Sequence, residues 1–145
     1  MAKEIVLGYD GITLADLVVI SRDHARVAIS EDSIERIAKT RKLIEKWVGE
    51  EKVIYGITTG FGALSDVIIS KEDTAQLQIN ILMCHSAGVG RPLDEETVRG
   101  TMALRIKDFA RGHSGISRQT VDHLVTLLNH NICPVMPEKG SVGAS

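Results

Sequence analysis

The first residue of this chain whose type and setting could do chemistry is Tyr55. It opens residues 55–62 (YGITTGFG), in which three glycines and two threonines interrupt the helical patterning on either side. A tyrosine acts as a general base only when fixed donors or positive charge lower the pKa of its hydroxyl, which is about 10 in water. The alternative is a packing tyrosine whose hydroxyl bonds to a backbone partner. The residues alone leave both roles open.

His85 is the second candidate. It follows Cys84 and precedes residues 86–90 (SAGVG), where an expected helix gives way to small residues. A helix end that opens onto such a loop is a suitable place for a side chain that recognises a ligand. The alternative is an exposed or locally hydrogen-bonded histidine. A third segment, residues 137–145 (PEKGSVGAS), is also rich in small residues.

Spacing argues against two other kinds of site. Residues 60–62 (GFG) begin like a phosphate-binding loop, but Ser65 stands where a third glycine would be needed, and no Lys-Ser/Thr pair follows. The cysteines, Cys84 and Cys133, and the five histidines lack the spacing of metal ligands. We therefore expect no metal site. Both cysteines lie in apolar stretches, which favours small, buried, free thiols.

Helices are expected on either side of these segments, and each expected helix begins at a residue that can cap it. Expected helices run from Thr13 to about Ile20, from Ser30 to Gly49, from Ser70 to about Ser86, from Asp94 to before Gly112, and from Ser117 to before Asn131. Short strands are expected over Glu4–Tyr9 and Arg26–Ile29. The fold class is therefore mainly α, with short strands at the start.

Apolar residues at helical spacing predict the buried faces of three of these helices. The predicted faces are Ile34, Ile37, Ala38, Ile44, Trp47 and Val48 in the helix that begins at Ser30; Val98, Met102, Ile106, Phe109 and Ala110 in the one that begins at Asp94; and Val121, Leu124, Val125 and Leu128 in the last.

Composition narrows the class of protein. The 145 residues match one average domain, and 43% of them are hydrophobic, which supports a real core. The formal net charge of −2 argues against a nucleic-acid or anionic-membrane binder. No signal peptide or stretch long enough to span a bilayer is evident. We expect a reduced, cytoplasmic protein.

Taken together, and in this order along the chain, residues 55–62, 84–90 and 137–145 resemble three motifs of the histidine and aromatic amino-acid ammonia-lyase family. In that family an Ala-Ser-Gly tripeptide cyclises and loses water to give 4-methylidene-imidazol-5-one, an electrophile made from the backbone. The resemblance makes Ala144 and Ser145 the first two residues of that tripeptide. It also makes Tyr55 the base that takes the β-proton of the substrate.

The resemblance further implies a substrate. The two residues before the small-residue run select it, and His85 matches the histidine-specific branch, whereas Cys84 stands where a serine is usual. Thr58 also differs from the histidine-specific pattern, because histidine-specific members often carry asparagine at this position and threonine is common in the aromatic branch. The favoured reaction is elimination of ammonia from L-histidine to give trans-urocanate. A phenylalanine or tyrosine ammonia-lyase, or an aminomutase, is the alternative.

The resemblance also implies an incomplete site. Family members are several times longer, and a central bundle of long helices follows the cofactor. We expect residues 1–145 to be a single N-terminal domain or fragment of this fold without that bundle, in which residues 137–145 form the cofactor-approaching loop. No glycine follows Ser145, so the chain alone is expected to be inactive. It would work within a homotetramer or with a complementary C-terminal chain, or be a non-catalytic fragment that assembles with a partner.

Overall fold

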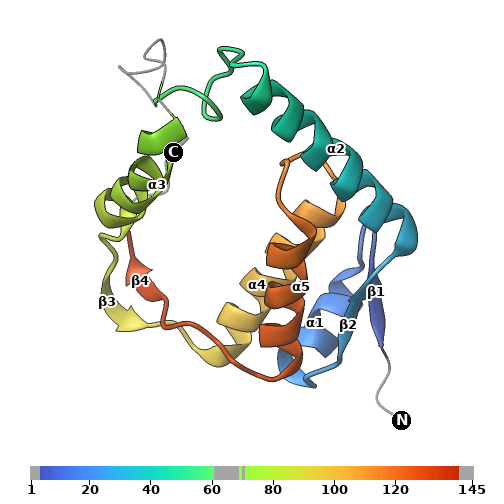
Figure 1. The fold of residues 1–145 in the computed structure, drawn as a ribbon. Coiled ribbons are helices and arrows are strands. Elements are labelled where there is room, and N and C mark those ends of the chain that lie inside the picture. The colour runs from blue at the N-terminus through green and yellow to red at the C-terminus, as the bar shows by residue number, and fades with distance from the viewer. Residues whose placement is uncertain (1–3, 61–68, 70, 141–145) are drawn as a thin grey trace.

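The computed structural model describes residues 4–60, 69 and 71–140. Its elements, in chain order, are β1 (Ile5–Leu7), α1 (Leu14–Arg22), β2 (Val27–Ile29), α2 (Glu31–Gly49), α3 (Lys71–His85), β3 (Val89–Pro92), α4 (Glu95–Ala110), α5 (Arg118–Asn129) and β4 (Pro137–Lys139). The chain is mainly helical, as predicted, and α3 stands across from α4 and α5 (Figure 1). Within the described residues, no helix is long and apolar enough to cross a membrane.

Four of the predicted helix starts are confirmed by their caps. Thr13 and Asp16 form a reciprocal capping box at the start of α1, in which the Thr13 hydroxyl accepts from the Asp16 N–H at 3.1 Å. Ser30, Asp94 and Ser117 each accept a hydrogen bond from the backbone N–H three residues later. These bonds satisfy N–H groups that lack a partner within the helix. Ser70, the fifth predicted start, lies outside the described residues.

The core lies between the parallel pair β1–β2 and helices α1, α4 and α5. The predicted buried faces of α4 and α5 are confirmed, because every predicted residue of α4 is buried and those of α5 are buried or half-buried. The prediction for α2 is wrong at two positions. Ile37 is buried, but Ala38 and Val48 are exposed. The helix buries only one narrow face, at Ser33 and Ile37, and its C-terminal part extends past the core (Figure 1).

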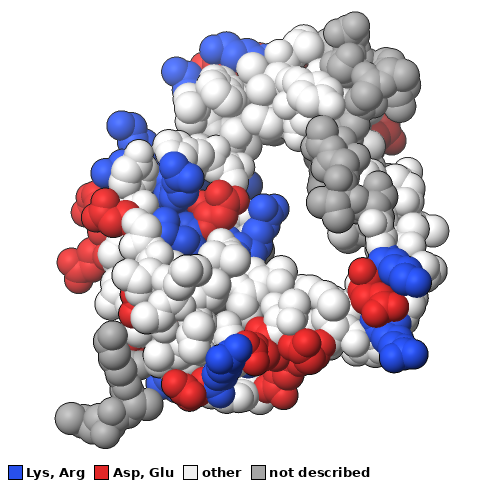
Figure 2. Space-filling model, turned by 180° about the vertical axis from the view of Figure 1, so that it is seen from behind, with Lys and Arg blue, Asp and Glu red and all other residues white. Residues whose placement is uncertain are grey.

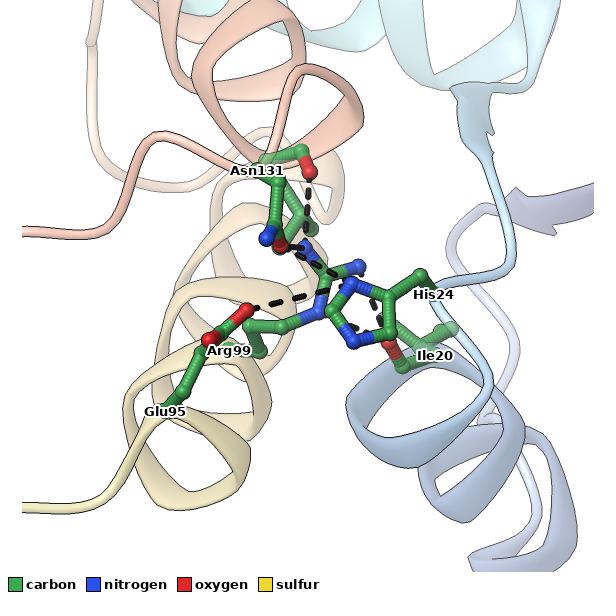
Figure 3. Close-up of polar contacts among 6 residues, drawn as sticks. Ile20, His24, Glu95, Arg99 and Asn131 are labelled. Carbon is green, nitrogen blue, oxygen red and sulfur yellow. Dashed lines mark hydrogen bonds and ion pairs between the residues drawn. The ribbon is translucent and has the colours of Figure 1, made fainter.

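A buried arginine on α4 joins three helices (Figure 3). The side chain of Arg99 is 1% exposed, and its guanidinium donates to the backbone carbonyl of Ile20 in α1 and of Leu128 in α5. It also donates to the side-chain oxygen of Asn131 at 2.6 Å. Both carbonyls belong to the last turn of their helix, where the helix dipole is negative. Arg99 therefore links α4 to the C-terminal ends of α1 and α5.

Candidate active site

The pairing of β3 with β4 brings two of the three sequence motifs together. The strands are antiparallel, with Val89 opposite Lys139 and Pro92 opposite Pro137. The N–H of Leu93 extends the contact by donating to the carbonyl of Met136 at 2.8 Å. The end of the second motif, residues 88–90, and residues 137–140 are therefore neighbours, although about fifty positions separate them in the chain. Residues 137–139, which were expected to lie in a loop, form strand β4.

Glycines permit this close approach. A Cβ placed on Gly88 would lie 3.0 Å from Cγ of Pro137, which is tighter than ordinary contact. Gly90 has a φ of +100°, and a Cβ there would lie 2.8 Å from Cγ of Glu138. Larger residues would strain the backbone or push the strands apart. The glycines of residues 86–90 are therefore needed because residues 137–140 pack directly against them.

His85 is the last residue of α3 and is exposed. Its Nδ1 lies 2.9 Å from the carbonyl oxygen of Ile81 and 3.0 Å from Sγ of Cys84. A carbonyl oxygen only accepts, so the bond to Ile81 requires the proton on Nδ1. Nε2 of a neutral ring is then left as an acceptor, able to receive an N–H from a ligand.

Cys84 does not occupy the buried position that its apolar surroundings predicted. It is exposed, whereas Cys133 is half-buried, and both are free. The physical reason is that α3 stands apart from the other helices (Figure 1), so the apolar residues on either side of Cys84 are exposed as well. These include Leu82 and Met83, which are 68% and 74% exposed.

Tyr55 lies in a tight turn that begins shortly after α2. The hydroxyl of Thr58 accepts from the N–H of Ile54 at 2.9 Å and donates to the carbonyl of Lys52. Gly56, with a φ of +72°, supplies a backbone conformation that other residues rarely adopt. The turn is therefore fixed by the residues around Tyr55, whose own side chain is 59% exposed.

The threonine after Thr58 anchors the end of this turn. Thr59 is 1% exposed, and its hydroxyl lies within hydrogen-bond distance of the N–H of Gly56 and the carbonyl of Gly60. The N–H of Ile69 donates to the carbonyl of Thr58, which ties the turn to the residues just before α3. Phe61 and Gly62, the rest of the predicted motif, lie outside the described residues.

The structure brings only part of the predicted site together. The turn that carries Tyr55 lies toward the N-terminal end of α3, whereas His85 is at its C-terminal end (Figure 1). Ala144 and Ser145 lie outside the described residues. The approach of β4 to β3 was missed by sequence reasoning. Its one available signal was the glycine and alanine content shared by residues 86–90 and residues 140–144.

The comparisons with known proteins agree with this arrangement of motifs. The sequence profile of the aromatic amino acid lyase family matches residues 12–145, so the chain belongs to that family. It is 50% identical to a histidine ammonia-lyase from Caldanaerobacter subterraneus subsp. tengcongensis over 143 residues. It is 51% identical to histidine ammonia-lyase 1 of Fusobacterium nucleatum over 142 residues. The matches cover 99% and 98% of the chain but 28% of each relative, at its N-terminal end.

Solved structures show the same local fold. The chain superposes on histidine ammonia-lyase from Trypanosoma cruzi with a TM-score of 0.88 and 34% identity, covering 96% of this chain and 27% of that one. It superposes on a tyrosine aminomutase from Streptomyces globisporus with a TM-score of 0.90 and 30% identity, covering 96% of this chain and 26% of that one. The predicted N-terminal segment of the ammonia-lyase fold is therefore confirmed.

Proposed function

We propose that this chain is the N-terminal part of an ammonia-lyase that eliminates ammonia from L-histidine to give trans-urocanate. The observation that carries the proposal is the β3–β4 pairing. It places the segment that follows His85 against the segment that leads to Ala144 and Ser145. The identity of 43–51% to histidine ammonia-lyases supports histidine as the substrate. The chain spans 28% of those relatives, so the remaining residues of the site would come from other parts of the assembled protein.

The proposed chemistry assigns each described residue one task. Tyr55, acting as the general base in its deprotonated form, takes the β-proton of the substrate on its phenolate oxygen. The electron pair of that C–H bond forms the new carbon–carbon double bond. The carbon–nitrogen bond breaks at the same carbon skeleton, and its electron pair leaves with the protonated amine group, –NH3⁺, which departs as ammonia. Nε2 of His85 accepts an N–H from the imidazole ring of L-histidine. This bond would select histidine over apolar aromatic amino acids.

The proposed cofactor is 4-methylidene-imidazol-5-one, formed from Ala144, Ser145 and a glycine that follows them. Bound in the site, this group supplies the electrophile that activates the amine for departure. The described residues fit a backbone that folds closely here. A Cβ on Gly88 would lie 3.0 Å from Cγ of Pro137, and Gly140 lies beside Gly88, where a Cβ on Gly140 would be at an ordinary contact distance of 3.7 Å from the Cα of Gly88.

The proposed partners follow from the same reasoning. We propose an amino-acid substrate and assembly into a homotetramer or with a complementary C-terminal chain, with residues 1–145 inactive alone. The exposed apolar side chains of Ile79, Leu82 and Met83 on α3 support a requirement for further protein contacts. The two free cysteines are consistent with a reducing, cytoplasmic location. Nucleic acid and membrane have no part in the proposal.

The test uses a chimera in which residues 1–145 replace the matching N-terminal part of the histidine ammonia-lyase from Caldanaerobacter subterraneus. We expect the chimera to release ammonia and urocanate from L-histidine. Tyr55→Phe should lower kcat by about a thousandfold, because general-base catalysis contributes about 10² to 10⁴ in rate. The matched control is Tyr9→Phe, which changes the other tyrosine of the chain and should leave kcat unchanged.

Two outcomes would contradict the proposal. An inactive but folded chimera would argue for a non-catalytic fragment that assembles with a partner chain. Near-normal activity of the Tyr55→Phe variant would remove the proposed base.

An aromatic ammonia-lyase or an aminomutase is the second candidate. The observation that favours it is the TM-score of 0.90 to a tyrosine aminomutase, together with threonine at position 58. Chromatography of the chimera's products from L-histidine, L-tyrosine and L-phenylalanine separates the possibilities. Cinnamate-type products would indicate an aromatic lyase, and β-amino acids would indicate an aminomutase.

A further inference from the structure

A groove lined by basic side chains lies between α2 and the end of α4, away from the β3–β4 pair. Its cavity has a volume of about 490 Å³. The cationic and titratable residues that line it are Arg36, Lys39, Lys42, Lys46, Arg111 and His113, and no acidic residue is among the lining residues. Figure 2 shows Lys and Arg side chains gathered on the side of the molecule that holds α2, with some Asp and Glu beside them. This concentration is local, since the whole chain carries a net charge of −2.

Three of these cations have no carboxylate partner among the described residues. Within the described residues, no ion pair or side-chain hydrogen bond is found for Lys39, Lys42 or Arg111. Arg36 bonds to Asp32 through Nε at 2.7 Å, and Lys46 lies 3.7 Å from a carboxylate oxygen of Glu50. Lys39, Lys42 and Lys46 lie three, four and seven positions apart, so they share one face of α2. Like charges placed in this way repel one another unless an anion lies between them.

The two arginines are held in place by an aromatic ring. The guanidinium of Arg36 lies 4.6 Å from the ring centroid of Tyr9, and that of Arg111 lies 5.9 Å from it. The ring of His113 meets the same tyrosine edge-on at 6.3 Å. Cation–π contacts of this kind fix a guanidinium while leaving its N–H groups free to donate. The wall of the groove is thus preorganised for an anion.

The floor of the groove is equally fixed. Gly112 has a φ of +75°, and a Cβ there would lie 2.5 Å from Cβ of Arg36, so the loop after α4 contacts α2 directly. The hydroxyl of Thr40 lies within hydrogen-bond distance of the carbonyls of Arg36 and Gly112. These contacts keep the basic residues of α2 and of the α4 end at a constant separation.

We propose that this groove binds a small polyanion, a molecule with clustered phosphate or carboxylate groups, separately from the proposed lyase site. Guanidinium groups bind both kinds of oxyanion. Lysine ammonium groups add positive charge and do not require the anion to approach from one fixed direction. A cavity of 490 Å³ is the size of a small-molecule site. Binding would offset the repulsion among the unpaired cations and so stabilise the folded chain.

The experiment measures thermal unfolding and isothermal titration calorimetry of the 145-residue chain with pyrophosphate and, separately, with citrate. We expect at least one of them to raise the Tm more than sodium chloride does at the same ionic strength. The double variant Lys39→Gln/Lys42→Gln should bind at least about tenfold more weakly, which corresponds to about 1.4 kcal/mol, because it removes two charge-assisted contacts to the anion.

The control is Lys52→Gln/Lys139→Gln, which removes the same charge from exposed lysines outside the groove. It should retain the affinity of the unmodified chain. A response to pyrophosphate alone would assign phosphate compounds, a response to citrate alone would assign polycarboxylates, and either supports the site. Three results would overturn it: no response beyond that to sodium chloride, unchanged affinity in the Lys39/Lys42 variant, or equal losses in the two double variants.

Discussion

At the scale of single residues, Arg99 connects three helices. Its guanidinium makes four hydrogen bonds, two of them to the carbonyl of Ile20, and the side chain is almost completely buried. A lysine keeps the charge but lacks the fork of donors that reaches two helices at once. We predict that Arg99→Lys lowers the free energy of unfolding by about 2–4 kcal/mol, because buried carbonyls lose their partners.

The matched control for that prediction lies on the same helix. Arg105 is exposed and forms an ion pair with Asp108 at 3.4 Å, an interaction that contributes about 1 kcal/mol or less. Arg105→Lys should therefore change the free energy of unfolding by less than about 0.5 kcal/mol. Urea unfolding followed by circular dichroism measures both variants. Similar losses in the two would contradict the structural role given to Arg99.

His85 carries the second prediction at this scale. With its Nδ1 proton directed to the carbonyl of Ile81, its Nε2 is available to the substrate ring. In the chimera, His85→Leu should lower kcat/KM for L-histidine by at least about tenfold, since a lost hydrogen bond to a polar substrate weakens its binding. Activity toward L-phenylalanine should rise relative to that toward L-histidine.

The control for this prediction is His123→Leu, which changes an exposed histidine on α5. It should leave the substrate profile of the chimera as it was. An unchanged ratio of histidine to phenylalanine activity in the His85→Leu variant would remove the reason for assigning histidine.

Two residues show what sequence reasoning could not supply. Arginine is ordinarily a surface residue, so nothing in the neighbourhood of Arg99 predicted burial, although Val98 and Met102 were correctly placed in the core. Cys84 shows the reverse error, because its apolar neighbours suggested burial, but no helix of the described part of the chain covers them. Burial depends on which elements meet, and that information is not local.

At the scale of elements, the capping residues predicted the helices well, and the short strands after α3 were missed. Thr13, Ser30, Asp94 and Ser117 each act within one turn of the chain, so their effect is visible in a local window. Strands β3 and β4 are short and exposed, and the segment of chain between them contains the whole of α4 and α5. Such strands lack the alternating pattern that identifies a half-buried strand.

The N-cap of α4 gives a prediction about pH. The backbone N–H and hydroxyl of Thr97 bond to the Asp94 carboxylate and hold its pKa below the ordinary value, with the N–H bond as the largest cause. A lowered pKa in the folded chain means that this contribution is complete above about pH 4 and is lost as the pH falls through the folded pKa. Asp94→Asn keeps a capping oxygen but does not titrate.

We therefore expect Asp94→Asn to be less stable than the unmodified chain at about pH 7, and the gap to narrow as the pH falls below about 4 and through the lowered pKa of Asp94 in the folded chain. Urea unfolding across this range measures the gap. Asp23→Asn is the control, because Asp23 stands at the C-terminal end of α1 and caps no helix start. A stability difference for Asp94→Asn that stays constant with pH would show that the carboxylate is not the source of the cap's strength.

At the scale of the whole molecule, helices α1, α4 and α5 form a packed body, and α3 lies apart from it. Helices α1, α4 and α5 share a core with β1 and β2, whereas α3 is connected to this body by the turn after α2 and by β3 (Figure 1). Figure 2 shows an opening through the molecule between these parts. The exposed Leu82 and Met83 make α3 an element whose apolar surface is not covered by the rest of the described chain. Helices of this length gain most of their stability from packing, and the described side chains of α3 are mostly exposed.

Amide hydrogen exchange tests this division. In the 145-residue chain, backbone amides of α3 should exchange at least about a hundredfold faster than those of α4, because a difference of about 2.7 kcal/mol in opening free energy gives that factor. In the chimera, further protein contacts should cover α3 and slow its exchange, while α4 should be protected in both proteins. Equal protection of α3 and α4 in the 145-residue chain would mean that α3 is stable without a partner. Fast exchange of α3 in the active chimera would mean that the rest of the enzyme does not pack on it, and the proposed need for assembly would then have to rest on the catalytic residues alone.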